Sequence, residues 1–143
     1  MGVGVGATQP PSPVSQPPTP NPHLPARYLH VDGGMADNIR PALYGARYTA
    51  LLANRASESA DELVHIAGRY CESGDVLIRE IRLPRADLGE ILAVATAGAY
   101  TLSMASNYNL VPRPALLLVG DGRARVIQRR ETYADLTARD LAF

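Results

Sequence analysis

The stretch that decides the fold of this chain reads Leu63-Val64-His65-Ile66-Ala67-Gly68-Arg69-Tyr70-Cys71-Glu72-Ser73-Gly74-Asp75-Val76-Leu77-Ile78-Arg79-Glu80-Ile81. Its two apolar runs, 63–67 and 76–81, have the length and composition of β-strands. The polar segment between them has a glycine near each end, Gly68 and Gly74, as a tight loop requires. The sequence therefore predicts two strands joined by a loop, in which both glycines permit positive φ.

This loop contains Cys71, the only cysteine of the chain, followed directly by Glu72. Adjacent side chains point in different directions from a loop, so the thiol could donate a proton while the carboxylate binds a positive group. A lone cysteine is, however, more often a small buried hydrophobic residue. The two residues by themselves leave both interpretations open.

Outside this stretch, short apolar runs alternate with turn signals, which predicts a mainly β domain with short helices. About six to eight strands arranged as a sandwich or a partly closed barrel would account for the pattern. Strands are expected at residues 28–31, 48–53, 62–67, 76–83 and 90–96, and Asp121-Gly122 favours a hairpin between 115–119 and 125–129. Helical segments are expected at residues 39–44, 97–106 (a helix or a loop) and 132–139, with Gly45 ending the first and Thr132 capping the last.

The predicted helix 39–44 contains polar side chains that could bind a ligand. Asp37 or Asn38 can cap this helix. Arg40 and Tyr44 are four residues apart and share one helical face, so a guanidinium and a phenol would point at one ligand. The alternative is that the arginine is solvated and the tyrosine packs at an edge.

Residues 1–27 differ in composition from residues 28–143, which form the expected domain. Eight of the 12 prolines lie within residues 1–25. Proline removes backbone donors and favours extended conformations without a core, so this segment is interpreted as a disordered linker. Two alternatives are a proline-rich ligand for a partner domain and a segment that is not native coding sequence.

Composition excludes several classes of function. The 143 residues have zero formal net charge, which does not favour nucleic acid or an anionic membrane as a partner. A single cysteine cannot form an internal disulfide and fits a reducing cytoplasm. No apolar run approaches the roughly 20 residues that span a bilayer. All 14 basic residues are arginine, so chemistry that needs a lysine amine is not possible within this chain.

Four stretches carry a resemblance to a known family: Val31-Asp32-Gly33-Gly34-Met35-Ala36-Asp37-Asn38-Ile39-Arg40-Pro41-Ala42-Leu43-Tyr44, Cys71-Glu72-Ser73-Gly74-Asp75, Ala97-Gly98-Ala99-Tyr100, and Tyr108-Asn109 with Arg113-Pro114 close behind. In this order they resemble the diaminopimelate decarboxylases, pyridoxal-phosphate enzymes of lysine biosynthesis. The resemblance extends from about residue 28 to residue 140. It implies the C-terminal β domain of alanine-racemase and diaminopimelate-decarboxylase-type enzymes, whose (β/α)₈ barrel is absent from this chain.

The resemblance also implies roles for five residues. Cys71 would be the proton donor, and Glu72 would contact the distal ammonium of the substrate. Arg40 would hold a substrate carboxylate, Tyr44 would bind the same end, and Tyr100 would contact both cofactor and substrate. The cofactor would be pyridoxal 5′-phosphate and the substrate meso-diaminopimelate, and no metal is expected.

The missing lysine has a consequence for activity, because this family anchors its cofactor on a lysine amine. We therefore expect the chain to be inactive alone and to depend on a barrel domain or subunit, in a full enzyme that is a homodimer. A fragment of a related ornithine or arginine decarboxylase is an alternative, although glutamate after the cysteine favours diaminopimelate. Another alternative is a non-catalytic module that pairs with an intact decarboxylase and regulates it.

Overall fold

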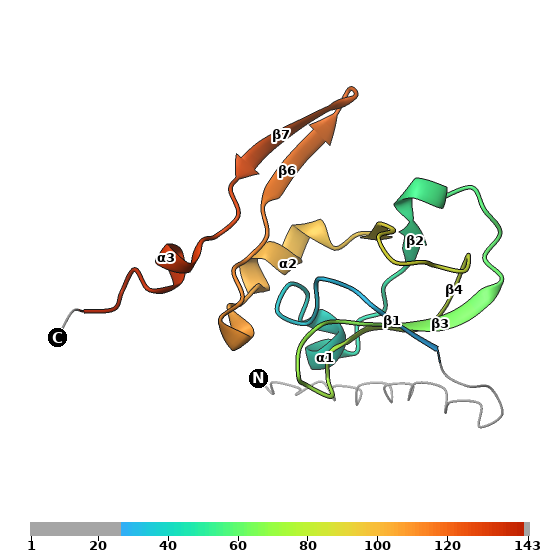
Figure 1. Cartoon of the computed structure of the whole chain (residues 1–143), viewed down its shortest axis with the longest axis horizontal. Coiled ribbons are helices and arrows are strands. Elements are labelled where there is room, and N and C mark those ends of the chain that lie inside the picture. Colours follow the sequence, from blue (N-terminus) through green and yellow to red (C-terminus); the bar gives the residue numbers. More distant parts are fainter. Residues whose placement is uncertain (1–26, 142–143) are drawn as a thin grey trace, which may run out of the picture.

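The computed structural model describes residues 27–141, so nearly all of the segment predicted to be a linker lies outside the described residues (Figure 1). The described part is mainly β, with short helices, as the sequence predicted. Its strands form a three-stranded sheet and two separate two-stranded sheets, and no closed barrel is present within residues 27–141.

The central sheet has the order β1-β3-β4, with β1 spanning Arg27–His30, β3 Glu62–Ala67 and β4 Val76–Leu83. Strand β1 pairs with β3 in parallel, and β3 pairs with β4 antiparallel across the cysteine loop. The buried core lies on these strands and consists of Val64, Ile66, Leu77, Ile78 and Leu83. The two apolar runs that flank the loop are thus neighbouring strands, as predicted, and they carry the buried core.

A β-bulge in β4 adjusts which side chains reach this core. Val64 pairs with Ile81 and Ile66 pairs with Ile78, so β4 has one residue more than β3 between the two pairs. Glu80 occupies the bulge with φ 57° and donates its N–H to Nδ1 of His65 at 3.2 Å. As a result, Ile78 and Ile81 both pack at the core although they are three residues apart.

A second, two-stranded sheet pairs β2 (Ala50–Leu52) with β5 (Leu92–Val94) in antiparallel fashion. Both strands are shorter than the expected 48–53 and 90–96. Strand β2 stops early because the 3₁₀ turn η1 (Ala53–Arg55) begins directly after it.

Short helices lie between the strands or follow the last one: α1 (Arg40–Tyr44), α2 (Gly98–Met104), the 3₁₀ turn η2 (Tyr108–Leu110) and α3 (Tyr133–Leu136). Gly45 ends α1 in the left-handed conformation, and Thr132 caps α3 through a capping box, both as predicted. Neither predicted residue is the N-cap of α1, although Oδ1 of Asn38 accepts the N–H of Arg40, the first residue of the helix, at 3.4 Å. Ile39 is the N-cap residue, and the Asp37 carboxylate instead accepts the N–H of Gly34 at 2.9 Å. Pro41 also removes one of the N–H groups that a cap would bind.

The third sheet is the predicted hairpin, formed by β6 (Leu116–Gly120) and β7 (Arg123–Gln128), and it projects away from the central sheet in Figure 1. Asp121 and Gly122 both have positive φ, 51° and 69°, as a two-residue hairpin turn requires. One face of the hairpin is entirely apolar and exposed. It consists of Leu117, Val119, Ala124 and Val126, and we call it the hairpin apolar face.

Candidate functional site

The loop between β3 and β4 presents Cys71 and Glu72 to solvent. Backbone hydrogen bonds close it: Gly68 N donates to the carbonyl of Asp75 at 3.0 Å, and Asp75 N donates to the carbonyl of Glu72 at 3.0 Å. An exposed thiol next to an exposed carboxylate is an arrangement that a ligand can reach. It does not match a small buried hydrophobic residue, the alternative left open for Cys71.

The reason for the glycines of this loop differs from the expected one. Neither Gly68 nor Gly74 has positive φ, so the expectation of left-handed backbone is wrong. Gly68 is instead required by a close approach, because a Cβ there would lie 2.2 Å from Oδ2 of Asp75. The requirement comes from a side chain seven residues away and not from the local turn.

Arg40 lies between two tyrosine rings supplied by different helices. Its guanidinium carbon is 5.5 Å from the ring centroid of Tyr44 in α1 and 5.1 Å from that of Tyr100 in α2. These distances are within the range of cation–π attraction, which holds the guanidinium in place. Both rings are more than 60% exposed, so an incoming ligand can reach this group. The structure thus brings together three of the five residues singled out in the sequence, and we call them the Arg40 group.

The segment before α1 also contacts the end of α2. Ser106 N donates a hydrogen bond to the carbonyl of Ala36 at 2.9 Å. This contact fastens the chain after α2 to the loop that leads into α1. It explains how Tyr100 reaches Arg40 although the two residues are 60 positions apart in the sequence.

Tyr108 is a neighbour of the cysteine loop to which the sequence assigned no role. Its hydroxyl lies 3.4 Å from Oε2 of Glu72, and its ring meets that of Tyr70 edge-on at 5.7 Å. Tyr70 is buried, and this burial raises the pKa of its phenol above the ordinary value. The only signal in the sequence was that Tyr108 lies in one of the four stretches carrying the resemblance.

The five predicted residues form two groups. Arg40, Tyr44 and Tyr100 contact one another, and Cys71 and Glu72 lie on the loop beside Tyr108. Within residues 27–141, no hydrogen bond or ion pair joins the Arg40 group to Cys71 or Glu72. A single ligand could contact all five residues only if it lay between the two groups, or at an interface where two copies of the chain each contribute one group.

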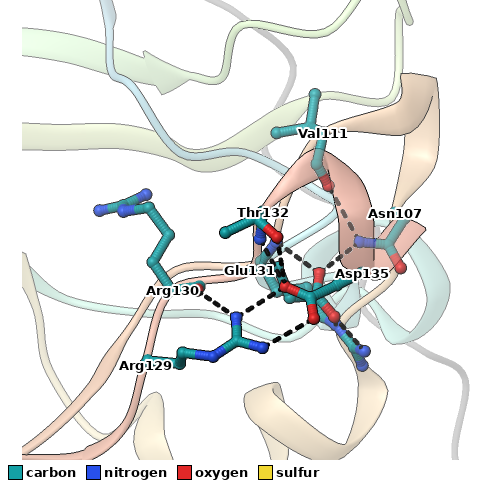
Figure 2. Close-up of polar contacts among 8 residues, drawn as sticks. Asn107, Val111, Arg129, Arg130, Glu131, Thr132 and Asp135 are labelled. Carbon is teal, nitrogen blue, oxygen red and sulfur yellow. Dashed lines mark hydrogen bonds and ion pairs between the residues drawn. The ribbon is translucent and has the colours of Figure 1, made fainter. Parts of the chain in front are cut away.

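Glu131 fastens the segment that carries Tyr108 to the chain after the hairpin (Figure 2). Its Oε2 accepts from Nδ2 of Asn107 at 2.6 Å and from N of Arg113 at 2.8 Å, and its Oε1 accepts from Nε of Arg113 at 2.8 Å. The Arg113 guanidinium is the main reason that the pKa of Glu131 is lowered to about 2. Nothing in the sequence indicated this contact, because its partners are 18 and 24 residues away.

A second ion pair lies beside it at the start of α3. Both terminal nitrogens of the Arg129 guanidinium, Nη1 and Nη2, donate to the Asp135 carboxylate, at 2.6 and 2.7 Å. Asp135 also accepts the N–H of Thr132, and Arg129 lowers the pKa of its carboxyl. The predicted cap of α3 is therefore part of a charged contact (Figure 2).

Two further properties concern the described residues as a whole. In this part of the chain, no three His, Cys, Asp or Glu side chains are grouped so that they could hold a metal ion. Also within this part, no helix has the length and apolar character needed to cross a membrane.

Comparisons of the sequence and of the structure with known proteins point to the same family. Residues 12–98 match the family described as pyridoxal-dependent decarboxylase, C-terminal sheet domain. The diaminopimelate decarboxylase of Bacillus subtilis is 55% identical over 117 residues, which are 82% of this chain and 27% of that protein. A crystal structure of diaminopimelate decarboxylase from M. jannaschii superposes with a TM-score of 0.74 at 40% identity, over 80% of this chain and 26% of that one.

A second crystal structure of the M. jannaschii enzyme, described as a co-complex with L-lysine, gives a TM-score of 0.73 at 40% identity, with the same coverage of both chains. The chain thus spans about a quarter of the length of the relatives that it matches.

Proposed function

Since the chain belongs to the pyridoxal-dependent decarboxylases, through their C-terminal sheet domain, we propose that it acts as the C-terminal part of a diaminopimelate decarboxylase. The reaction would convert meso-2,6-diaminopimelate to L-lysine and carbon dioxide. The names of its relatives support this substrate, and so does the glutamate that follows Cys71. The observation that carries the proposal is the Arg40 guanidinium held between Tyr44 and Tyr100.

The Arg40 group binds one end of the substrate in this proposal. A guanidinium donates two parallel hydrogen bonds to a carboxylate, which fixes both its position and its orientation. The two tyrosine rings limit the rotamers of Arg40 before the ligand arrives, so less side-chain freedom is lost on binding. Tyr44 and Tyr100 add hydroxyl donors at the same end.

The cysteine loop performs the proton transfer. The thiol of Cys71 donates its proton to the α-carbon after carbon dioxide has left, and the resulting thiolate takes a proton from water. Glu72 binds the distal ammonium, with its carboxylate held by the hydroxyl of Tyr108. An acid and an anion placed next to each other on one loop can therefore serve the two ends of one substrate.

The described residues provide only part of a site for the family's cofactor. The chain has no lysine, so none of its residues can anchor pyridoxal phosphate. The exposed phenol of Tyr100 and the guanidinium of Arg40 fit one wall of such a site. When bound, the cofactor withdraws the electrons left at the α-carbon as carbon dioxide departs. The anchoring lysine must come from another segment or another polypeptide.

We infer that this missing part is a (β/α)₈ barrel, and that the complete enzyme is a homodimer in which the cysteine loop of one subunit completes the site of the other. The separation of Cys71 and Glu72 from the Arg40 group supports such a shared site. We place the protein in the cytoplasm, because a thiol that must stay reduced suits a reducing compartment.

A chimera tests the proposal. Residues 28–140 of this chain would replace the matching C-terminal region of the Bacillus subtilis decarboxylase, and release of carbon dioxide from meso-diaminopimelate would be measured. We expect an active chimera in which Cys71→Ala lowers kcat about a hundredfold or more, the usual contribution of a positioned acid. Arg40→Gln should raise KM about tenfold or more, because a charged hydrogen bond is lost. Asp87→Asn, at an exposed carboxylate remote from the loop, is the matched control.

Two results would overturn the proposal. One is a folded, active chimera in which Cys71→Ala leaves kcat unchanged. The other is release of carbon dioxide by the isolated 143-residue chain with added pyridoxal phosphate, because no lysine is available to it. If the chain were only a regulator, it would change the rate of the intact Bacillus subtilis enzyme, and the chimera would be inactive.

A further inference from the structure

Asp75 is the only charged side chain that is buried among residues 27–141, with 3% of its surface exposed. It ends the loop whose tip presents Cys71 and Glu72 to solvent. None of the ion pairs in the described part of the chain includes it. A buried carboxylate is costly unless hydrogen bonds replace the water that it loses, so its partners identify what it does.

The two oxygens of this carboxylate bind two different loops. Oδ2 accepts the N–H of Tyr70, within its own loop, at 2.8 Å. Oδ1 accepts the N–H of Met35, in the loop after β1, at 2.7 Å. Both distances are short, as expected for hydrogen bonds to a charged acceptor. Asp75 therefore bridges the cysteine loop and the 33–38 loop.

Two glycines leave the room that this bridge needs. A Cβ at Gly68 would lie 2.2 and 2.3 Å from the two carboxylate oxygens. A Cβ at Gly34 would lie 2.7 Å from Oδ1 of Asp75 and 2.6 Å from the ring of Tyr70. Neither glycine has positive φ, so the space around the carboxylate, and not backbone conformation, explains both residues.

The 33–38 loop is connected to both helices that carry the Arg40 group. It runs directly into α1, and its Ala36 carbonyl accepts the N–H of Ser106 after α2. A residue that fixes this loop against the cysteine loop therefore fixes the two groups relative to each other within one chain, and so fixes where each lies in the two sites of the proposed homodimer.

We propose that Asp75 is a positioning residue, which fixes the place of the Cys71–Glu72 tip relative to the Arg40 group within one chain by binding the N–H groups of Met35 and Tyr70. The catalytic meaning of this arrangement rests on the proposed function, but the positioning itself does not. Asp75 touches no substrate in this proposal and acts through the loops that it joins.

The test uses the full chain and its single cysteine, and it involves neither substrate nor cofactor. A nitroxide attached to Cys71 reports the mobility of the loop tip, and hydrogen exchange reports the amides of Met35 and Tyr70. Asp75→Asn places an NH₂ group against one of the two N–H donors. The affected amide should exchange about tenfold to a hundredfold faster, as loss of a hydrogen bond to a charged group predicts. The nitroxide spectrum should sharpen, while amides of β3 keep their protection.

Asp87→Asn is again the control, because it removes the same charge from an exposed position. A second variant, Gly34→Ala, keeps the carboxylate but pushes the two loops apart, so it should give the same sharpened spectrum. If Asp75→Asn does not fold, Gly34→Ala decides the question.

Positioning by Asp75 is refuted if folded variants keep the wild-type nitroxide spectrum and wild-type exchange. It is equally refuted if either amide already exchanges rapidly in the unaltered chain. An inactive chimera with the expected exchange would instead contradict the proposed function and leave the positioning intact.

Discussion

Replacement of Leu83 by alanine tests where the stability of this domain originates. Leu83 ends β4, is 2% exposed and belongs to a cluster of five among the nine buried hydrophobic residues of the described part. A buried leucine replaced by alanine costs about 2–5 kcal/mol, because transfer energy is lost and a cavity remains. A domain of this length would have a free energy of unfolding of roughly 6–17 kcal/mol. Because the core is small, we expect the lower end, so this one change should remove a third or more of the stability.

Leu118 is the matched control, a leucine of β6 with 54% of its surface exposed. Its replacement by alanine leaves no enclosed cavity and should cost about 1 kcal/mol or less. Urea unfolding followed by circular dichroism, at two protein concentrations to detect association, measures both variants. Leu83→Ala should lower the midpoint by about 1 M or more with an unchanged slope. Equal losses in the two variants would refute the conclusion that stability resides in the β1-β3-β4 core.

Three further predictions concern other parts of the chain. The pKa of Glu131 is lowered from 4.5 to about 2, chiefly by Arg113, so the contribution of this contact is complete above pH 4.5 and is lost as pH falls through 2. The difference in unfolding free energy between wild type and Glu131→Gln should therefore be large at neutral pH and disappear near pH 2, and a pH-independent difference would contradict this. The isolated chain should associate through its hairpin apolar face, so Leu117→Lys should elute later in gel filtration than the wild type, whereas a wild type that is already a monodisperse monomer would exclude such association. Gly45 has φ 63°, so Gly45→Val should lower thermal stability by about 1–2 kcal/mol and Gly45→Asn by less, and equal melting temperatures would show that α1 can end in another way.

Local patterns in the sequence were sufficient to predict several elements of this fold. The runs on either side of the cysteine loop form strands because each is short and apolar, and the polar segment between them marks their connection. The hairpin was equally predictable, since Asp121 and Gly122 adopt the positive φ that their turn requires. Thr132 and Asp135, three residues apart, form the capping box that begins α3.

Contacts between distant segments could not be predicted in this way. The sequence placed Arg40 and Tyr44 on one helical face, but the second ring, Tyr100, arrives from another helix. The contact of Tyr108 with Glu72 likewise depends on how η2 packs. The explanation offered for Gly68 was wrong for the same reason, because its requirement comes from a carboxylate that folds back over it.

The roles of the five site residues are even harder to predict from local sequence patterns. They require a ligand and a second polypeptide surface, and no pattern within one chain contains either. The resemblance therefore identified the residues before any physical pattern could assign them functions.

The parallel pairing of β1 with β3 has a consequence for the order of events during translation. Arg27 pairs with Val64, so roughly 2–7 s separate the emergence of the two partners from a ribosome that adds about 5–20 residues per second. A hairpin such as β3–β4 forms within about 1–10 μs once both strands are available. Strand β1 is therefore made first and waits for its partner, and until β3 emerges its edge is open to any other nascent strand nearby. The loop that bears Cys71 can close only after β4 has followed β3 out of the ribosome.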